Sequence, residues 1–201
     1  MTTNLAGIDG CPAGWMVVTW TGHPSDPPEA RILPDFAAVL ALPVAIIAVD
    51  MPIGLPERAG PGGRQACNEA RARLGARQSS VFSVPSRAAV MCTDYREACR
   101  TNFENSDPPR KVAKQCFNLF NKIREIDRLI TSGDQDRVFE VHPELAFWAM
   151  NSEKPLALPK KVKSRPDPDG MKLRRHLLRQ AGFPIDTLQR GTWKAAEAAE
   201  D

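Results

Sequence analysis

The chain has 201 residues, of which 42% are hydrophobic and 25% are charged, and its formal net charge is +3. These proportions are those of an ordinary globular protein, and the length suits one domain, at most with an inserted helical subdomain. The weak positive charge permits an anionic partner but does not require one.

Cysteine usage and the apolar runs exclude several classes of protein. The five cysteines are odd in number and contain no CxxC pair, which argues against a disulfide framework or a zinc knuckle. Residues 1–5 lack the pattern of a signal peptide, and no apolar run approaches the ~18 residues of a membrane span. We therefore expect a cytoplasmic protein with reduced thiols.

The first part of the chain predicts strands. Residues 5–9 and 15–20 flank a Gly/Pro turn and predict a hairpin, and residues 29–33 predict a third strand. A short helix is expected over residues 36–42. The pattern is typical of an antiparallel beginning to a sheet.

An apolar run at residues 44–49 predicts a strand buried on both faces. This strand ends at Asp50, because the prolines and the glycine of residues 51–56 cannot continue a central strand. Asp50 is therefore expected at the carboxyl end of a buried strand, where α/β folds place their sites.

The remainder is mostly helical. Helices are predicted over residues 64–74, 94–103, 112–130, 143–150 and 169–180, the last capped by Asp169 and stopped by Gly182. The other predictions are an extended segment at 79–85, a strand at 137–142, a loop at 154–168 and a helix-prone stretch at 187–201. This order fits a mixed sheet continued through crossover helices.

Three carboxylates stand out. Asp9 and Asp50 end strands, and Glu140 lies within the strand predicted at 137–142. If these strands are neighbours, the carboxylates repel one another unless one is protonated or a cation lies between them. Hard oxygen ligands suit Mg²⁺ or Mn²⁺, and two such ions would fit phosphodiester hydrolysis. Alternatively, each carboxylate is a turn or helix-cap residue.

Asp127 and His142 are candidate supporting residues. Asp127 lies on the apolar stripe of its predicted helix. We therefore expect Asp127 to be the buried partner of an arginine, with direct metal ligation as the alternative. His142 can act as a base or ligand, although a lone histidine is more often structural.

Basic residues offer candidate substrate contacts. Arg64 and Arg71 are seven residues apart on one helix face, where they can hold phosphates, pair with the site carboxylates or face solvent. Lys161 lies in a basic loop that is either a nucleic-acid contact or a solvated face. Aromatic residues are scarce around this loop, which does not favour a base-stacking platform.

The chain also resembles the domain of unknown function 429 family, described as predicted nucleases with a ribonuclease H-like fold. The resemblance spans about residues 5 to 182. The matching pieces are Ala6-Gly7-Ile8-Asp9-Gly10-Cys11, Gly14-Trp15, Ala48-Val49-Asp50-Met51-Pro52-Ile53-Gly54-Leu55-Pro56, Arg64, Cys67, Ala70-Arg71, Leu74-Gly75, Ser80-Val81-Phe82, Pro85, Lys122-Ile123-Arg124-Glu125-Ile126-Asp127 and Phe139-Glu140-Val141-His142-Pro143-Glu144.

The resemblance implies a mixed five-stranded ribonuclease H-like sheet flanked by helices, with extra helices inserted between the fourth and fifth strands. The first strand would lie beside the fourth and the fourth beside the fifth, which would bring Asp9, Asp50 and Glu140 side by side as catalytic and metal-binding residues. Two departures from the family pattern are visible. Asn68 replaces an expected aspartate, and the chain stops at Asp201, where an acidic motif in a last helix should begin. We therefore expect a single domain over residues 1–201 whose final helix is cut short or lacks its ligand.

The leading hypothesis is a metal-dependent nuclease acting on nucleic acid, either monomeric or homodimeric. A nucleotide-binding or phosphotransfer protein of related fold is the first alternative, because Asp9-Gly10 and Gly14 can face a phosphate. The absence of a P-loop sequence disfavours it. A non-catalytic binding module is the second alternative.

Overall fold

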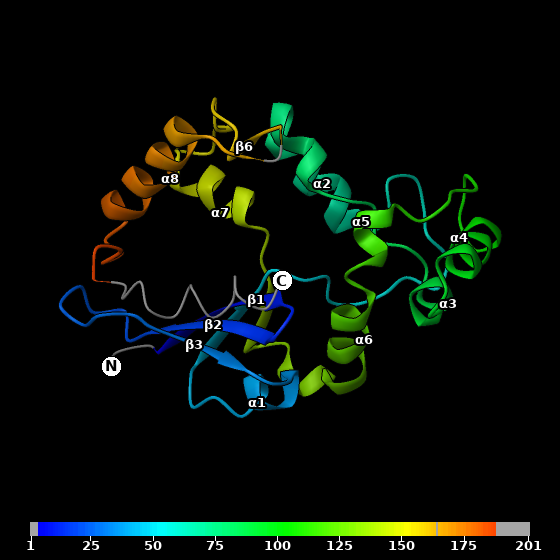
Figure 1. Ribbon diagram of the computed structural model, residues 1–201, viewed down its shortest axis with the longest axis horizontal. Coiled ribbons are helices and arrows are strands. Elements are labelled where there is room, and N and C mark those ends of the chain that lie inside the picture. The colour runs from blue at the N-terminus through cyan, green and yellow to red at the C-terminus, as the bar shows by residue number, and fades with distance from the viewer. Residues whose placement is uncertain (1–3, 164, 188–201) are drawn as a thin grey trace. The chain divides into compact units, whose positions relative to one another are not determined.

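The computed structural model describes residues 4–163 and 165–187, which belong to two compact units (Figure 1). The first unit comprises the described residues of 1–50 and 131–201, and the second comprises Met51–Ile130. The second unit therefore lies in the chain between the fourth and fifth strands, where extra helices were expected. The helix-prone end predicted beyond Thr187, and the last-helix ligand with it, fall outside the described residues.

A mixed five-stranded sheet forms the centre of the first unit, in the order β3-β2-β1-β4-β5. Its strands are β1 (Leu5–Cys11), β2 (Gly14–Trp20), β3 (Glu29–Leu33), β4 (Ile46–Val49) and β5 (Val138–Glu140). The first three form an antiparallel meander, whereas β4 is parallel to both β1 and β5. The predicted neighbours, first beside fourth and fourth beside fifth, are confirmed.

The turn from β1 to β2 requires a glycine. Gly14 has φ +138°, and a Cβ at this position would lie 2.2 Å from the carbonyl oxygen of Leu33 in β3. Any side chain here would therefore push β3 away from the hairpin.

One face of the sheet carries the apolar core of the first unit. Ile47 and Val49 of β4 are fully buried, and Trp15 of β2 packs on Phe36 at 5.0 Å between ring centroids. Phe36 opens helix α1 (Phe36–Leu40), whose first turn is capped by the Asp35 carboxylate. The prediction that β4 is buried on both faces is wrong, because its alternate residues remain partly exposed as in an ordinary pleated strand.

Two longer helices complete the first unit, together with the short helix η2 (Ser132–Asp134) and the two-residue strands β6 (Lys161–Val162) and β7 (Arg165–Pro166). Helix α7 (Pro143–Met150) begins after β5, as predicted. Helix α8 (Pro168–Gln180) is capped by Asp167, whose carboxylate accepts from the Gly170 N–H at 2.8 Å. The predicted cap, Asp169, is wrong because Pro168 already occupies the first helical position.

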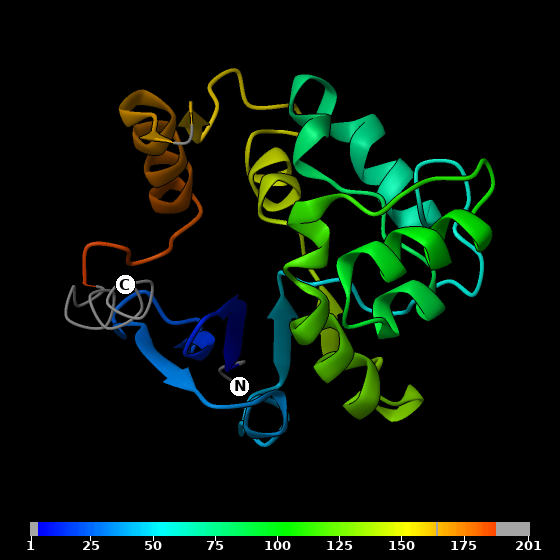
Figure 2. The same ribbon diagram turned by 45° about the vertical axis from the view of Figure 1, so that its right-hand side comes forward.

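The second unit is helical (Figure 2, green). Its elements are α2 (Gln65–Leu74), η1 (Gly75–Ser80), α3 (Arg87–Met91), α4 (Tyr95–Glu104), α5 (Lys114–Phe117) and α6 (Phe120–Leu129). Helix α3 was not predicted, and the first two residues of the segment expected to be extended belong to η1.

The continuous helix predicted over residues 112–130 is wrong. Asn118 and Leu119 separate α5 from α6, and Phe117 packs edge-on against Tyr95 of α4 at 5.2 Å between ring centroids. Tertiary packing here outweighs helical periodicity. Across the described part of the chain, no helix combines the length and the apolar character that a bilayer span requires.

Candidate carboxylate site

The strand register brings Asp9 and Asp50 together. Ile8 is paired with Val49 in the parallel β1–β4 ladder, and the Asp50 N–H donates to the Ile8 carbonyl at 2.9 Å. Asp9 and Asp50 are therefore the next residues on adjacent strands, where the pairing between β1 and β4 ends. The expectation that Asp9 ends its strand is wrong, because β1 continues to Cys11 through its pairing with β2. Side chains at matched positions of a parallel pair leave the sheet on the same face.

Glu140 reaches the same edge in a different register. It is paired with Val49, one residue before Asp50, and the Val141 N–H donates to the Val49 carbonyl at 2.9 Å. Because side chains alternate along a strand, Glu140 leaves the sheet on the face of Val49, opposite to Asp50. The structure thus makes Asp9 and Asp50 the close pair, with Glu140 at a neighbouring position.

Burial and like charge act on Asp50. The pKa of Asp50 is raised to about 6. Burial is the largest cause, and the negative charge of Asp9 is the second. The charges of His142 and Lys160 act in the opposite direction, and Glu140 has the smallest effect. Asp50 is therefore a carboxyl group that ionises at a higher pH than an ordinary aspartate because of its surroundings.

Asp9 has a raised pKa for a similar reason. Loss of water is the largest cause, and it is opposed by the Gly10 backbone N–H and by the charge of Lys160. In the described residues, no lysine or arginine forms a salt bridge with Asp9 or Asp50.

His142 lies at the start of α7. Its Nδ1 accepts from the Glu144 N–H at 3.2 Å, so a neutral ring carries its proton on Nε2. The charge of His142 lowers the pKa of Asp50, which indicates that the ring is close to the carboxylate pair. A helix cap is thus its observed contact, and a role as base or ligand stays a prediction.

The donor set can be compared with the needs of a divalent cation. The described residues contain no group of three or more His, Cys, Asp or Glu side chains placed to hold a metal ion. Mg²⁺ is commonly bound through only one or two carboxylates, and it completes its shell with water and substrate phosphates. The Asp9–Asp50 pair fits that mode of binding and not an all-protein cage.

The predicted phosphate-binding arginines are engaged elsewhere. Arg64 donates from Nη1 to the carbonyls of Ile53 at 2.6 Å and Gly54 at 3.3 Å. Arg71 donates to the carbonyls of Val81 and Gly62 at 3.0 and 2.7 Å. Both therefore brace the loops of the second unit.

Among the basic loop residues, Lys160 is the one whose charge acts on both Asp9 and Asp50. Lys161, the predicted contact, lies exposed in β6. The basic run contains both lysines, and no periodic pattern in the sequence distinguishes one lysine of a loop from the next. The role of Lys161 as a substrate contact stays a prediction.

Asp127 has the structural role that was expected. Its carboxylate, with only 10% of the side chain exposed, forms an ion pair with Arg87 of α3. Arg87 also contacts Glu57 at 3.1 Å. The prediction of a buried arginine partner is confirmed, and the contact fixes α3 against α6.

Sequence reasoning missed a buried ion pair in the first unit. Glu144 of α7 accepts from Arg174 of α8 at 2.7 Å through both carboxylate oxygens, and the side chains are 8% and 5% exposed. Nothing local to either residue signals a partner 30 positions away.

Together, the fold and the site define an α/β protein with a mixed five-stranded sheet and paired carboxylates at the carboxyl edge of its parallel strands. The chain matches the family described as "Protein of unknown function (DUF429)" over residues 7–201 and belongs to it. No curated protein and no solved structure matches the chain.

Proposed function

We propose that the protein is a divalent-metal-dependent nuclease that hydrolyses phosphodiester bonds of nucleic acid. The observation that carries this proposal is the Asp9–Asp50 pair. Adjacent parallel strands place the two residues side by side, and neither has a salt-bridge partner among the described residues. Two carboxylates in this arrangement are stabilised by a hard cation, and a cation so held attracts phosphate oxygens.

A ribonuclease H-like fold belongs to the same proposal. The order β3-β2-β1-β4-β5, with an antiparallel meander followed by two parallel strands, agrees with the arrangement implied by the family resemblance. Fold analogy alone does not determine activity, so the proposal depends on the chemistry of the edge.

Asp9 and Asp50 would hold Mg²⁺ or Mn²⁺, whereas Glu140 ends at the same edge but leaves the opposite face of the sheet and is not assigned to the ion. When bound, the ion would stabilise charge on the phosphate and promote ionisation of a water molecule. Lys160 contributes positive charge near both aspartates, which attracts the phosphodiester to the pair. In the hydrolysis, water oxygen forms a new bond to phosphorus, the bridging P–O bond breaks, and the leaving oxygen takes up a proton.

The test is a cleavage assay with Mg²⁺ or Mn²⁺ on single-stranded, duplex and branched DNA and RNA. Asp50→Asn keeps the shape of the side chain, and we expect it to lower the rate by roughly 100-fold or more, as for other groups that act on developing charge. Glu29→Gln is the matched control, because this exposed carboxylate of β3 lies outside the pair.

Glu29→Gln should cleave like the wild type. Equal rates for the wild type and Asp50→Asn would show that the activity does not come from this site. Absence of metal-dependent cleavage on every substrate would contradict the proposed function itself.

A further inference from the structure

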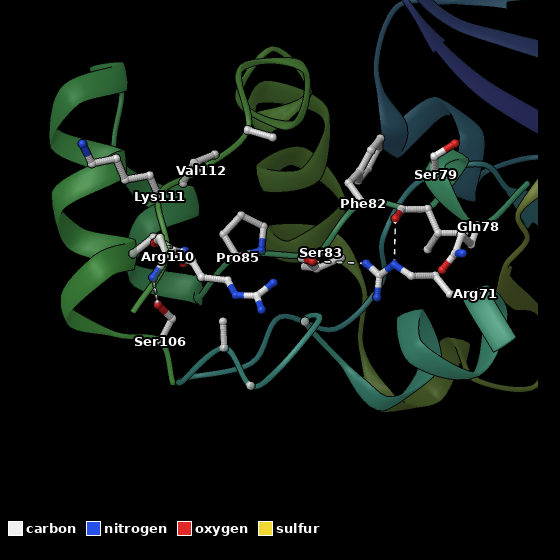
Figure 3. A pocket seen from close by; sticks show the side chains of 17 residues that line it. Arg71, Gln78, Ser79, Phe82, Ser83, Pro85, Ser106, Arg110, Lys111 and Val112 are labelled. Atoms are coloured by element: carbon white, nitrogen blue, oxygen red, sulfur yellow. Dashed lines mark hydrogen bonds between the residues drawn. The ribbon is translucent and has the colours of Figure 1, made fainter. Parts of the chain in front are cut away.

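A second candidate site lies within the helical unit, formed by residues that the nuclease proposal does not use. A cavity of about 420 Å³ is lined by Arg71 and by parts of residues 59–63, 78–85 and 102–113 (Figure 3). This volume is within the range of small-molecule sites, which are about 300–1,000 Å³.

The charges of the lining have one sign. Arg71, Arg110 and Lys111 contribute to it, and no Asp or Glu does. In Figure 3 the Arg71 and Arg110 side chains extend toward each other from opposite ends of the lining, with Ser83 and Pro85 between them. The Lys111 ammonium points away from this space.

Arg71 is held in place by neutral groups. Besides the two carbonyls already described, its guanidinium donates to Ser83 Oγ at 3.1 Å and to Asn68 Oδ1 at 3.0 Å. These bonds fix its orientation, but none of them compensates its charge, because each acceptor is uncharged.

Arg110 is anchored through its backbone. Its N–H donates to Ser106 Oγ at 2.8 Å, and its carbonyl accepts from Asn102 Nδ2 at 2.9 Å, both from buried side chains. Its guanidinium forms no salt bridge with any residue of the described part of the chain. The cavity therefore presents the fixed guanidinium of Arg71 and the exposed guanidinium of Arg110 without a lining carboxylate, an arrangement that suits a phosphate.

An aromatic ring and neutral polar groups lie at one end of the same lining. Phe82 is only partly buried, and Gln78 and Ser79 lie beside it at the Arg71 end in Figure 3. A ring of this kind can stack on a planar base, and an amide or hydroxyl can bind the edge of a base.

We propose that this cavity binds a nucleoside phosphate, with the phosphate between Arg110 and Arg71 and the base against Phe82. The inference does not depend on the nuclease proposal, because every lining residue lies in the second unit and the carboxylate pair lies in the first. The nucleoside phosphate is either a free mononucleotide or a unit of a strand, and the two sources share this chemistry.

The test is isothermal titration calorimetry at low salt with EDTA present, which removes any contribution from a metal-bound carboxylate site. The probes are AMP, UMP, a 5′-phosphorylated tetranucleotide, adenosine and inorganic phosphate. We expect AMP or UMP to bind more tightly than adenosine and inorganic phosphate. Tighter binding of the tetranucleotide than of AMP and UMP would assign the site to strands.

Arg110→Ala should weaken the binding by roughly tenfold to a hundredfold, the effect of losing charge-assisted hydrogen bonds. Phe82→Leu should lower the affinity for the mononucleotides and leave the affinity for inorganic phosphate unchanged. Arg100→Ala is the matched control, because this exposed arginine of α4 is outside the lining. Circular dichroism verifies that each variant is folded.

Asp50→Asn should bind the mononucleotides like the wild type, which separates this site from the carboxylate pair. No binding of AMP, UMP or the tetranucleotide at millimolar concentration would overturn the proposal. Binding unchanged by Arg110→Ala, or equal affinity for inorganic phosphate and mononucleotide, would also overturn it.

Discussion

The sheet edge of the first unit and the cavity of the second unit each hold like charges that form no salt bridge among the described residues. At the edge, Asp9 and Asp50 have no salt-bridge partner, and in the cavity the same is true of Arg71 and Arg110, as far as the described residues extend. They differ in how they can relieve repulsion. The carboxyls can take up a proton, since the pKa of Asp50 is about 6. Guanidinium groups stay charged, so the cavity depends on an anion or on water.

Two charged pairs with little exposed carboxylate, one in each unit, are compensated. Glu144 pairs with Arg174 in the first unit, and Asp127 pairs with Arg87 in the second. The contrast teaches that a compensated buried charge holds helices together, whereas an uncompensated pair indicates where a ligand of opposite sign is expected. Four measurements can break or sharpen this contrast.

The largest expected effect is the loss of stability when the buried Glu144–Arg174 ion pair is broken. Glu144→Ala should destabilise the protein by about 3–5 kcal/mol, because it leaves Arg174 buried without a counter-charge. Urea denaturation followed by circular dichroism measures the loss. Asp186→Ala is the matched control, since its pair with Arg179 is 71% and 51% exposed. That change should cost far less stability, because water screens an exposed ion pair. If both variants lost the same free energy of unfolding, burial would not determine how much an ion pair stabilises this protein.

The second measurement concerns metal binding at the uncompensated edge. Mg²⁺ at 100 times its dissociation constant should stabilise the wild type by about 2.7 kcal/mol through linkage. Asp9→Asn and Asp50→Asn should each lose most of this gain, seen as a smaller rise in melting temperature. Asp127→Asn should keep it, because that carboxylate is occupied by Arg87. A gain that persists in both edge variants would place the metal elsewhere.

The edge site was within reach of sequence reasoning. An apolar run that stops at Asp50 predicts a buried strand with an acid at its carboxyl end, and the resemblance placed the Asp9 strand beside it. The register of Glu140 was not accessible, because a shift of one residue changes the face of a side chain without changing the pattern. Lys160 could not be preferred to Lys161, since loop geometry is not encoded in a periodicity.

The sequence also did not predict contacts between distant residues or a very short helix. The Glu144–Arg174 pair joins two helices separated by a loop, so neither residue carries a local sign of the other. Helix α3 covers only residues 87–91, too few for the apolar periodicity to be recognised. The break between α5 and α6 depends on packing against Tyr95, a contact between segments far apart in the sequence.

The third measurement uses pH. Burial raises the pKa of Asp50 to about 6, above its unfolded value, so the ionised form destabilises the folded state at high pH. In EDTA, Asp50→Asn should therefore be more stable than the wild type at pH 8, by about 1 kcal/mol after allowance for partial exposure. The difference should shrink as the pH falls through about 6 and disappear below about 4. A constant difference from pH 4 to pH 8 in thermal melts would contradict this origin, and Glu29→Gln should show no such pH-dependent gain.

The smallest expected effect separates the two lysines. The positive charge of Lys160 lowers the pKa of Asp9 and Asp50, so Lys160→Gln should raise both. Lys161→Gln removes an equal charge from the next residue of the loop and should leave both nearly unchanged. Carboxyl ¹³C shifts followed by NMR titration report each pKa directly. Asp9→Asn should shift the pKa of Asp50 in the opposite direction, downward, because the variant removes the negative charge of Asp9. If both lysine variants shift the two pKa values equally, the loop acts as a diffuse positive field and Lys160 has no particular place at the edge.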